Sequence, residues 1–146
     1  MRGSTLNNLL PQMLHRLETD TDVLPNEPGV YRLIALNTRG RPKPLARVGG
    51  KDSQGVLYIG RSQNLRSRLR SLRRMLFDGA PLGHIAGLTY RASPAIRRFA
   101  PPSRIAFHFK ASDDYKEQER KRLRTYFRKY GEVPPLNGRA EFITTP

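Results

Sequence analysis

Apolar residues recur along this chain at the three- and four-residue spacing of one helical face. Leucines follow that spacing in residues 65 to 77, which predicts the clearest helix of the chain. A stripe of tyrosine, leucine and phenylalanine predicts a second helix from Tyr115 to Tyr130, which ends shortly before the Pro134-Pro135 pair. A further run of leucines in residues 5 to 18 predicts an N-terminal helix, divided or kinked at Pro11.

Three shorter segments, rich in β-branched and aromatic residues, predict strands. They are Val30 to Leu36, Val56 to Gly60 and Ile105 to Phe109. Residues 37 to 55 are rich in glycine, proline and basic residues and indicate a long connection, and a short helix is expected near Ala95 to Phe99. Short strands need helices to cover them, so the pattern indicates one domain of the mixed α and β class over residues 1 to 146.

The charge balance narrows the choice of partner. The chain has 27 Lys and Arg against 12 Asp and Glu, a net charge of +15, and most of its cations are arginine. Such an excess favours a polyanionic partner, nucleic acid first and an anionic membrane second. Arginine binds phosphate through two nitrogens and stacks on bases, which favours nucleic acid.

The chain lacks residue types that several kinds of site require. The chain has no cysteine, which excludes disulfides, thiolate zinc sites and a cysteine nucleophile, and three histidines argue against a histidine-rich metal centre. No apolar run approaches the roughly 20 residues that cross a bilayer, and the N-terminus lacks the apolar segment of a signal peptide. We therefore expect a cytoplasmic protein without a membrane partner.

The predicted helix over residues 65 to 77 carries two kinds of arginine. Its outer face is either an ordinary solvated surface or one that follows nucleic-acid phosphates. The arginines of that face are Arg66, Arg70, Arg73 and Arg74. Arg68 instead falls inside the apolar arc by helical phase. A charge there requires an internal carboxylate or a substrate phosphate, unless its stem reaches past the leucines to water.

One acid lies on the apolar stripe of the predicted helix over residues 115 to 130. Glu119 falls in the middle of that stripe, whereas Glu117 points away from it toward solvent. A carboxylate on the core face of a basic protein requires a cation such as Arg68 or a metal ion. Oxygen ligands suit Mg²⁺ or Mn²⁺, and Mg²⁺ takes one or two protein carboxylates. The alternative is a structural Arg–Glu pair.

These residues, together with two tripeptides on the first two predicted strands, resemble the GIY-YIG nuclease superfamily. Gly29-Val30-Tyr31 stands at the place of the first family tripeptide, with valine for the middle isoleucine, and Tyr58-Ile59-Gly60 matches the second in full. Arg68 stands ten residues after Tyr58, where the family has its helical arginine. Glu119 on a later helix and Asn137 after the prolines complete the set.

The resemblance covers residues 28 to 138 as a nuclease core and leaves residues 1 to 27 as an N-terminal helical extension. It implies a small three-stranded antiparallel sheet flanked by helices. It also implies phosphodiester hydrolysis with one Mg²⁺ or Mn²⁺ per active site, held by Glu119.

The same resemblance implies a role for each matching residue. Tyr31 would take a proton from the attacking water, Tyr58 would position the phosphate or the nucleophile, and Arg68 would neutralise charge in the transition state. Asn137 would orient its neighbours through its amide hydrogen bonds. Tyr31 needs nearby positive charge to ionise near neutral pH, and Arg61 or the metal could supply it.

Three departures from the family pattern affect these roles. Many members carry a His or Tyr one turn after the arginine, but this chain has Leu72, so His84 or Arg61 would have to compensate. The connection between the tripeptides is longer than in compact members. The interval from Glu119 to Asn137 is longer too, which leaves Glu117 as a minor rival.

The leading hypothesis is an endonuclease acting on DNA, either restriction-like or structure-selective, with Arg61 and the outer arginines of helix 65–77 contacting DNA. A non-catalytic nucleic-acid-binding protein on the same fold is the second hypothesis, and Leu72 favours it. The third is an RNA-directed nuclease. A homodimer is left open.

Overall fold

The computed structural model describes residues 13–79 and 85–138. The strands are β1 (His15–Arg16), β2 (Gly29–Ala35), β3 (Leu45–Arg47), β4 (Gly50–Asp52), β5 (Val56–Ser62) and β6 (Ile105–Ala111). The α-helices are α2 (Leu65–Asp78), α3 (Ile85–Ala92), α4 (Pro94–Phe99) and α5 (Tyr115–Tyr130), with short 3-10 turns η1 (Thr21–Val23) and η2 (Pro102–Arg104). These elements form the mixed α and β class that the sequence predicts.

The sheet is built around β2. Its strand order is β1-β6-β2-β5, and every pairing in it is antiparallel. On β2, Tyr31 lies opposite Gly60 of β5 on one side and Phe109 of β6 on the other. The three predicted strands are therefore confirmed as neighbours in one antiparallel sheet, with β2 between β6 and β5, and the two-residue β1 adds a short strand at the edge beside β6.

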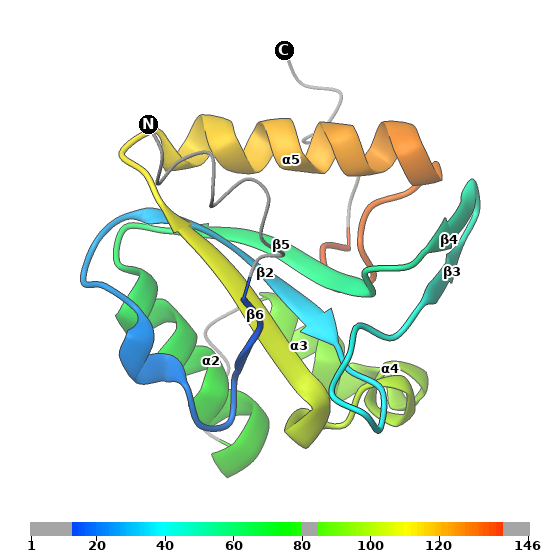
Figure 1. Cartoon of the computed structure of the whole chain (residues 1–146), viewed down its shortest axis with the longest axis horizontal. Coiled ribbons are helices and arrows are strands. Elements are labelled where there is room, and N and C mark those ends of the chain that lie inside the picture. The colour runs from blue at the N-terminus through cyan, green and yellow to red at the C-terminus, as the bar shows by residue number, and fades with distance from the viewer. Residues whose placement is uncertain (1–12, 80–84, 139–146) are drawn as a thin grey trace.

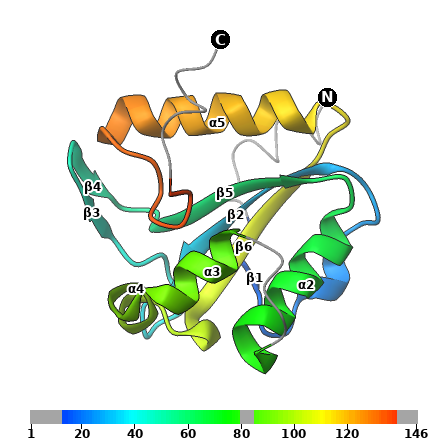
Figure 2. The ribbon, with the colours of Figure 1, turned by 180° about the vertical axis from the view of Figure 1, so that it is seen from behind.

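Helices cover both faces of this sheet. Figures 1 and 2 show α5 on one side and α2, α3 and α4 on the other. Because successive strand residues point to opposite faces, Leu33 and Phe107 enter the core under α2 and α3, whereas Ile59 packs against α5. The buried leucines 65, 69 and 72 of α2 complete the larger core, as their spacing predicts.

The prediction of a helix in residues 5 to 18 is wrong for its described part. Residues 1–12 lie outside the described residues, and His15 and Arg16 pair as a strand with Phe107 and Ala106. Leu17 continues this pairing with a 3.0 Å hydrogen bond from its N–H to the carbonyl of Ile105, and its side chain is fully buried. The open edge of β6 supplies backbone partners that override the local helical pattern.

Residues 37 to 55 are more ordered than a long connection, because β3 and β4 form a separate hairpin within them. Figure 1 shows this hairpin beside the C-terminal end of α5. The Gly49 N–H donates to the Tyr130 carbonyl at 2.7 Å, and Arg47 forms a 3.0 Å ion pair with Glu132. A Cβ at Gly49 would lie 2.8 Å from the Tyr130 carbonyl carbon, so the close approach requires glycine.

Two helix ends follow from local sequence. The Asn64 side chain accepts a hydrogen bond from the Ser67 N–H at 3.0 Å and so caps the start of α2. Gly131 ends α5 in the left-handed conformation, with φ of 74°, which glycine adopts without steric cost. These caps fix the start of α2 and the end of α5.

No helix in the described part of the chain is long and apolar enough to cross a membrane.

We predict that Leu69→Ala lowers the free energy of unfolding by about 2–5 kcal/mol, because Leu69 is fully buried between α2 and the sheet. Leu88→Ala is the matched control. Leu88 is 52% exposed, so its truncation should cost much less. Chemical denaturation of both variants measures the difference, and equal losses would contradict this placement of the core.

Candidate active site

Two tyrosines from neighbouring strands form the centre of the site. Tyr31 of β2 lies opposite Gly60, and Tyr58 of β5 lies opposite Leu33, so both rings emerge on the same face of the sheet. Their centroids are 5.9 Å apart. A Cβ at Gly60 would lie 2.5 Å from the Tyr58 ring and 2.7 Å from the Tyr31 hydroxyl. The glycine of the second tripeptide therefore makes room for both rings, a role that sequence reasoning did not assign.

Arg68 lies beside this tyrosine pair. It projects from the second turn of α2 and is neither fully buried nor fully exposed. Burial raises the pKa of Tyr31 far above its ordinary value, and Arg68 acts in the opposite direction through its charge and hydrogen bonding. Burial also raises the pKa of Tyr58, with Glu119 adding to the rise and Arg68 opposing it. Both tyrosines are therefore neutral phenols at neutral pH in the protein alone.

Glu119 approaches the same cluster from α5. Its side chain is 21% exposed, and the nearest cation is Arg61, whose Nε lies 3.7 Å from a carboxylate oxygen. Burial raises the pKa of Glu119, while Arg61, Arg120 and Arg68 lower it. The expected partner on the protein was Arg68, but the ion pair is made by Arg61. Arg68 acts on Glu119 only through its charge.

Glu117, the rival to Glu119, is placed differently. It is exposed and forms a 3.1 Å ion pair with Arg120 on the outside of α5. The helical phase that separated the two acids is therefore reproduced in the structure, and Glu119 is the acid that belongs to the cluster.

Asn137 is held at the free edge of β5. Its Oδ1 accepts a 3.0 Å hydrogen bond from the Ile59 N–H, and its Nδ2 donates to the Ile59 carbonyl at 2.8 Å. The Leu136 N–H donates to the Leu57 carbonyl at 2.9 Å. The side-chain amide thus pairs with the edge as another strand would. It fixes the backbone between Tyr58 and Gly60 and does not point at the tyrosine hydroxyls.

The remaining candidates are spread around α2. Arg66 and Arg73 donate at 2.6 Å to the carbonyls of Leu24 and Glu18, and Arg70 pairs with Asp22. These arginines tie α2 to the segment before β2. Arg74, by contrast, is exposed.

Two positions bear on the missing proton-transfer group. Leu72 is 1% exposed and lies in the same core cluster as Tyr31, and its aliphatic side chain can neither donate nor accept a proton. His84, one proposed substitute, lies outside the described residues. Arg61, the other, lies at the site.

The donor set fits a hard divalent cation bound mainly by water and substrate. Among the described residues, no group of three or more His, Cys, Asp or Glu side chains could enclose a metal. Glu119 offers a half-buried carboxylate that its 3.7 Å contact with Arg61 holds loosely. Mg²⁺ commonly binds through one or two carboxylates plus waters and phosphate oxygens, so one carboxylate here suffices.

The chain is similar to one curated protein in sequence. It is 42% identical over 72 residues to the UvrABC system protein C of Microcystis aeruginosa. The match spans 49% of this chain but only 9% of that much longer relative. No protein-family model matches the chain.

Two solved structures are similar to the chain. Both are the GIY-YIG N-terminal endonuclease domain of UvrC from Thermotoga maritima, in two tyrosine-to-phenylalanine point mutants bound to the catalytic divalent cation. They are 21% and 20% identical, cover 87% of this chain and 100% of their own, and each has a TM-score of 0.43. The sequence match to a UvrC protein, joined to the two tripeptides, confirms the resemblance to the GIY-YIG superfamily.

We predict that Asn137→Ala lowers the free energy of unfolding by about 1–3 kcal/mol, because it leaves the buried N–H and carbonyl of Ile59 without partners. Asn137→Asp keeps the acceptor and loses the donor, so it should be intermediate. Urea denaturation of the three proteins gives the order. If Asn137→Ala has the same free energy of unfolding as wild type, water replaces the amide without cost and the prediction is wrong.

Proposed function

We propose that this chain is a metal-dependent endonuclease that hydrolyses phosphodiester bonds in DNA. One observation carries the proposal. Tyr31, Tyr58, Arg68 and Glu119 come from β2, β5, α2 and α5, yet each affects the protonation of another in a single cluster. The net charge of +15 and the similarity to a UvrC protein support a nucleic-acid substrate.

The contact of Arg68 with the tyrosine pair supports a role for it in neutralising charge at the phosphate. Its guanidinium lies beside the Tyr31 hydroxyl on the tyrosine side of the sheet. A phosphate oxygen bound there would accept charge-assisted hydrogen bonds that strengthen as negative charge develops. Glu119 is screened by Arg61, so its carboxylate does not repel the incoming phosphate as a free acid would.

Tyr31 and Tyr58 would orient the reacting oxygens. In hydrolysis the water oxygen attacks phosphorus, the bond to the leaving oxygen breaks, and the water gives up a proton. A neutral Tyr31 positions that water by hydrogen bonding. To take its proton, Tyr31 must first become a phenolate, which Arg68 favours and burial opposes. Tyr58, which is less buried, positions the phosphate.

Glu119 would hold the divalent cation, Mg²⁺ or Mn²⁺, which supplies positive charge to a phosphate oxygen and to the leaving oxygen. Asn137 would act through the backbone of Ile59, by fixing the strand that carries Tyr58. Arg61 would limit the negative potential of the site and offer a phosphate contact.

A non-catalytic nucleic-acid-binding protein is the second candidate, because Leu72 is buried where many relatives of this type carry a His or Tyr. An RNA-directed nuclease would use the same cluster. Cleavage of plasmid DNA, RNA and single strands separates these candidates, and digestion of random-sequence DNA separates restriction-like from structure-selective cutting.

We predict that Glu119→Gln abolishes Mg²⁺-dependent plasmid nicking, while Glu117→Gln retains it. The two substitutions remove the same charge two residues apart on α5, but only Glu119 faces the cluster. Chelation with EDTA should stop the wild type. If the wild type binds DNA but never cuts it with Mg²⁺ or Mn²⁺, the binding protein is the correct description.

We predict that Arg68→Ala reduces the cleavage rate at saturating DNA by about 100-fold or more, since it removes a donor to the developing charge. Arg68→Lys should recover part of the rate, because lysine keeps the charge but not the two-pronged geometry. A nicking time course measures both. Wild-type cleavage by Arg68→Ala with an unchanged melting temperature would exclude Arg68 from the reaction.

A further inference from the structure

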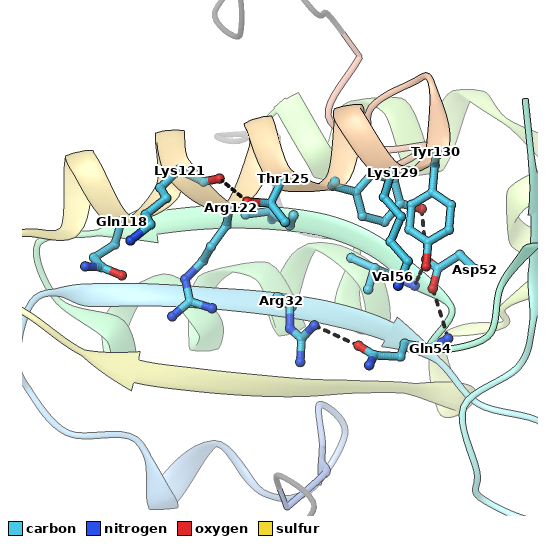
Figure 3. A pocket seen from close by; sticks show the side chains of 12 residues that line it. Arg32, Asp52, Gln54, Val56, Gln118, Lys121, Arg122, Thr125, Lys129 and Tyr130 are labelled. Atoms are coloured by element: carbon cyan, nitrogen blue, oxygen red, sulfur yellow. Dashed lines mark hydrogen bonds between the residues drawn. The ribbon is translucent and has the colours of Figure 1, made fainter. Parts of the chain in front are cut away.

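A second hollow lies on the other face of the sheet, between α5 and strands β2 and β5. It has a volume of about 400 Å³. Arg32 contributes from β2, Gln54 from the turn before β5, and Arg122 and Lys129 from α5. Figure 3 shows Arg122 reaching from α5 over the sheet toward the side where Arg32 projects. We call this hollow the α5 groove; it does not include Tyr31, Tyr58 or Arg68.

Two guanidiniums face the α5 groove at short range. Burial lowers the pKa of Arg32, and the charge of Arg122 lowers it further. Burial also lowers the pKa of Arg122. The Nε of Arg122 is buried without a hydrogen-bond partner among the described residues. Holding two cations together in a partly buried hollow costs free energy unless an anion joins them.

Among the described residues, the charge of Asp52 raises the pKa of Arg32 and so opposes the effect of burial and of Arg122. Of the described residues that line the groove, Asp52 alone is a carboxylate; it is 1% exposed and already accepts from Tyr126 and from the Val56 N–H. Eleven of the 12 acids fall within the described residues, and the twelfth, Glu141, lies outside them. An anion bound from solvent would add favourable charge interactions with the cations that line the groove.

Arg32 is held ready for such a ligand. Its Nη1 donates to Gln54 at 3.0 Å, and its Nη2 lies 2.7 Å from Nδ1 of His108 on β6. An arginine nitrogen can only donate, so Nδ1 of His108 is the acceptor in this contact. Gln54 and His108 thus orient the guanidinium from two sides at the wall of the groove.

We propose that the α5 groove binds a phosphate and its nucleotide from a single-stranded segment of DNA, with Arg32 and Arg122 sharing the phosphate. The groove is closed on one side by a helix and below by a sheet, and it has the volume of a small-ligand site, so one nucleotide enters but a duplex does not. Apolar side chains of Val56 and Ile59 line it beside the cations. A basic groove with an apolar wall is typical of single-strand binding.

The α5 groove and the candidate active site both take residues from α5. Arg122 follows Glu119 by three residues, so the two side chains lie on neighbouring turns of α5. A strand cut near Glu119 could therefore extend along α5 into the groove. This use of the groove depends on the proposed nuclease function, whereas the binding itself does not.

The test is the affinity for a fluorescent oligothymidylate, measured by anisotropy in EDTA so that neither metal nor cleavage contributes. Arg122→Met keeps the apolar stem and removes the charge, and it should weaken binding by about tenfold. Arg128→Met is the matched control on the same helix. Arg128 is exposed and does not line the groove, so this variant should bind within about twofold of wild type.

Two further measurements distinguish a ligand-binding role of Arg122 from a purely structural one. The melting temperature of Arg122→Met should equal or exceed that of wild type, because a buried cation and its orphaned Nε are removed. The slope of log affinity against log salt should fall by about 0.7 for Arg122→Met only. Arg122→Met should weaken the binding of a duplex of the same sequence less than it weakens the binding of the single strand.

Wild-type affinity and salt slope in Arg122→Met would overturn the proposal, and so would an equal loss for duplex and single strand. A lowered melting temperature with weaker binding would mean that Arg122 is structural. The same titration in a Glu119→Gln background separates the two proposals. If the protein never cuts DNA but Arg122→Met weakens its binding of single strands, the groove proposal stands and the nuclease proposal fails.

Discussion

The register of β2 against β5 is the constraint on which the rest of the molecule depends. It sets Gly60 opposite Tyr31, and only there does the missing side chain leave room for two phenol rings. A slip of one residue would turn Tyr31 toward α5 and Arg32 into the core beneath α2. The amide of Asn137, bound to both polar groups of Ile59, holds the outer strand in that register.

The two faces of β2 therefore have different chemistry. Tyr31 and Tyr58 emerge beside α2 and Arg68, where aromatic burial keeps the hydroxyls neutral. Arg32, next along the same strand, emerges under α5 and meets Arg122. Helix α5 links the two regions, because Glu119 and Arg122 lie on adjacent turns. Strand β2 and helix α5 thus each contribute residues both to the candidate active site and to the α5 groove.

The excess of arginine is not all available for ligand binding. Arg66 and Arg73 on α2 donate to carbonyls of the preceding segment, and Arg70 pairs with Asp22 there. Such bonds to neutral carbonyls satisfy the donors and leave the charge to act at long range. Arg122 differs, since its Nε has no hydrogen-bond partner in the described structure. Arg47 also has an unsatisfied Nε, but its Nη2 pairs with Glu132, whereas Arg122 forms no ion pair within the described part of the chain.

The sequence by itself determined the elements whose pattern is local. Helices α2 and α5 and the three central strands follow from periods of 3.6 and 2, which depend only on which side of an element is buried. The same phases set Arg68 and Glu119 apart from their exposed neighbours. Tertiary structure alone decided the pairing of β1, the β3–β4 hairpin, and the choice of Arg61 as the partner of Glu119. Edge pairing and ion pairing join residues that are far apart in the chain. The periodicity of one element does not indicate which distant residue it will contact.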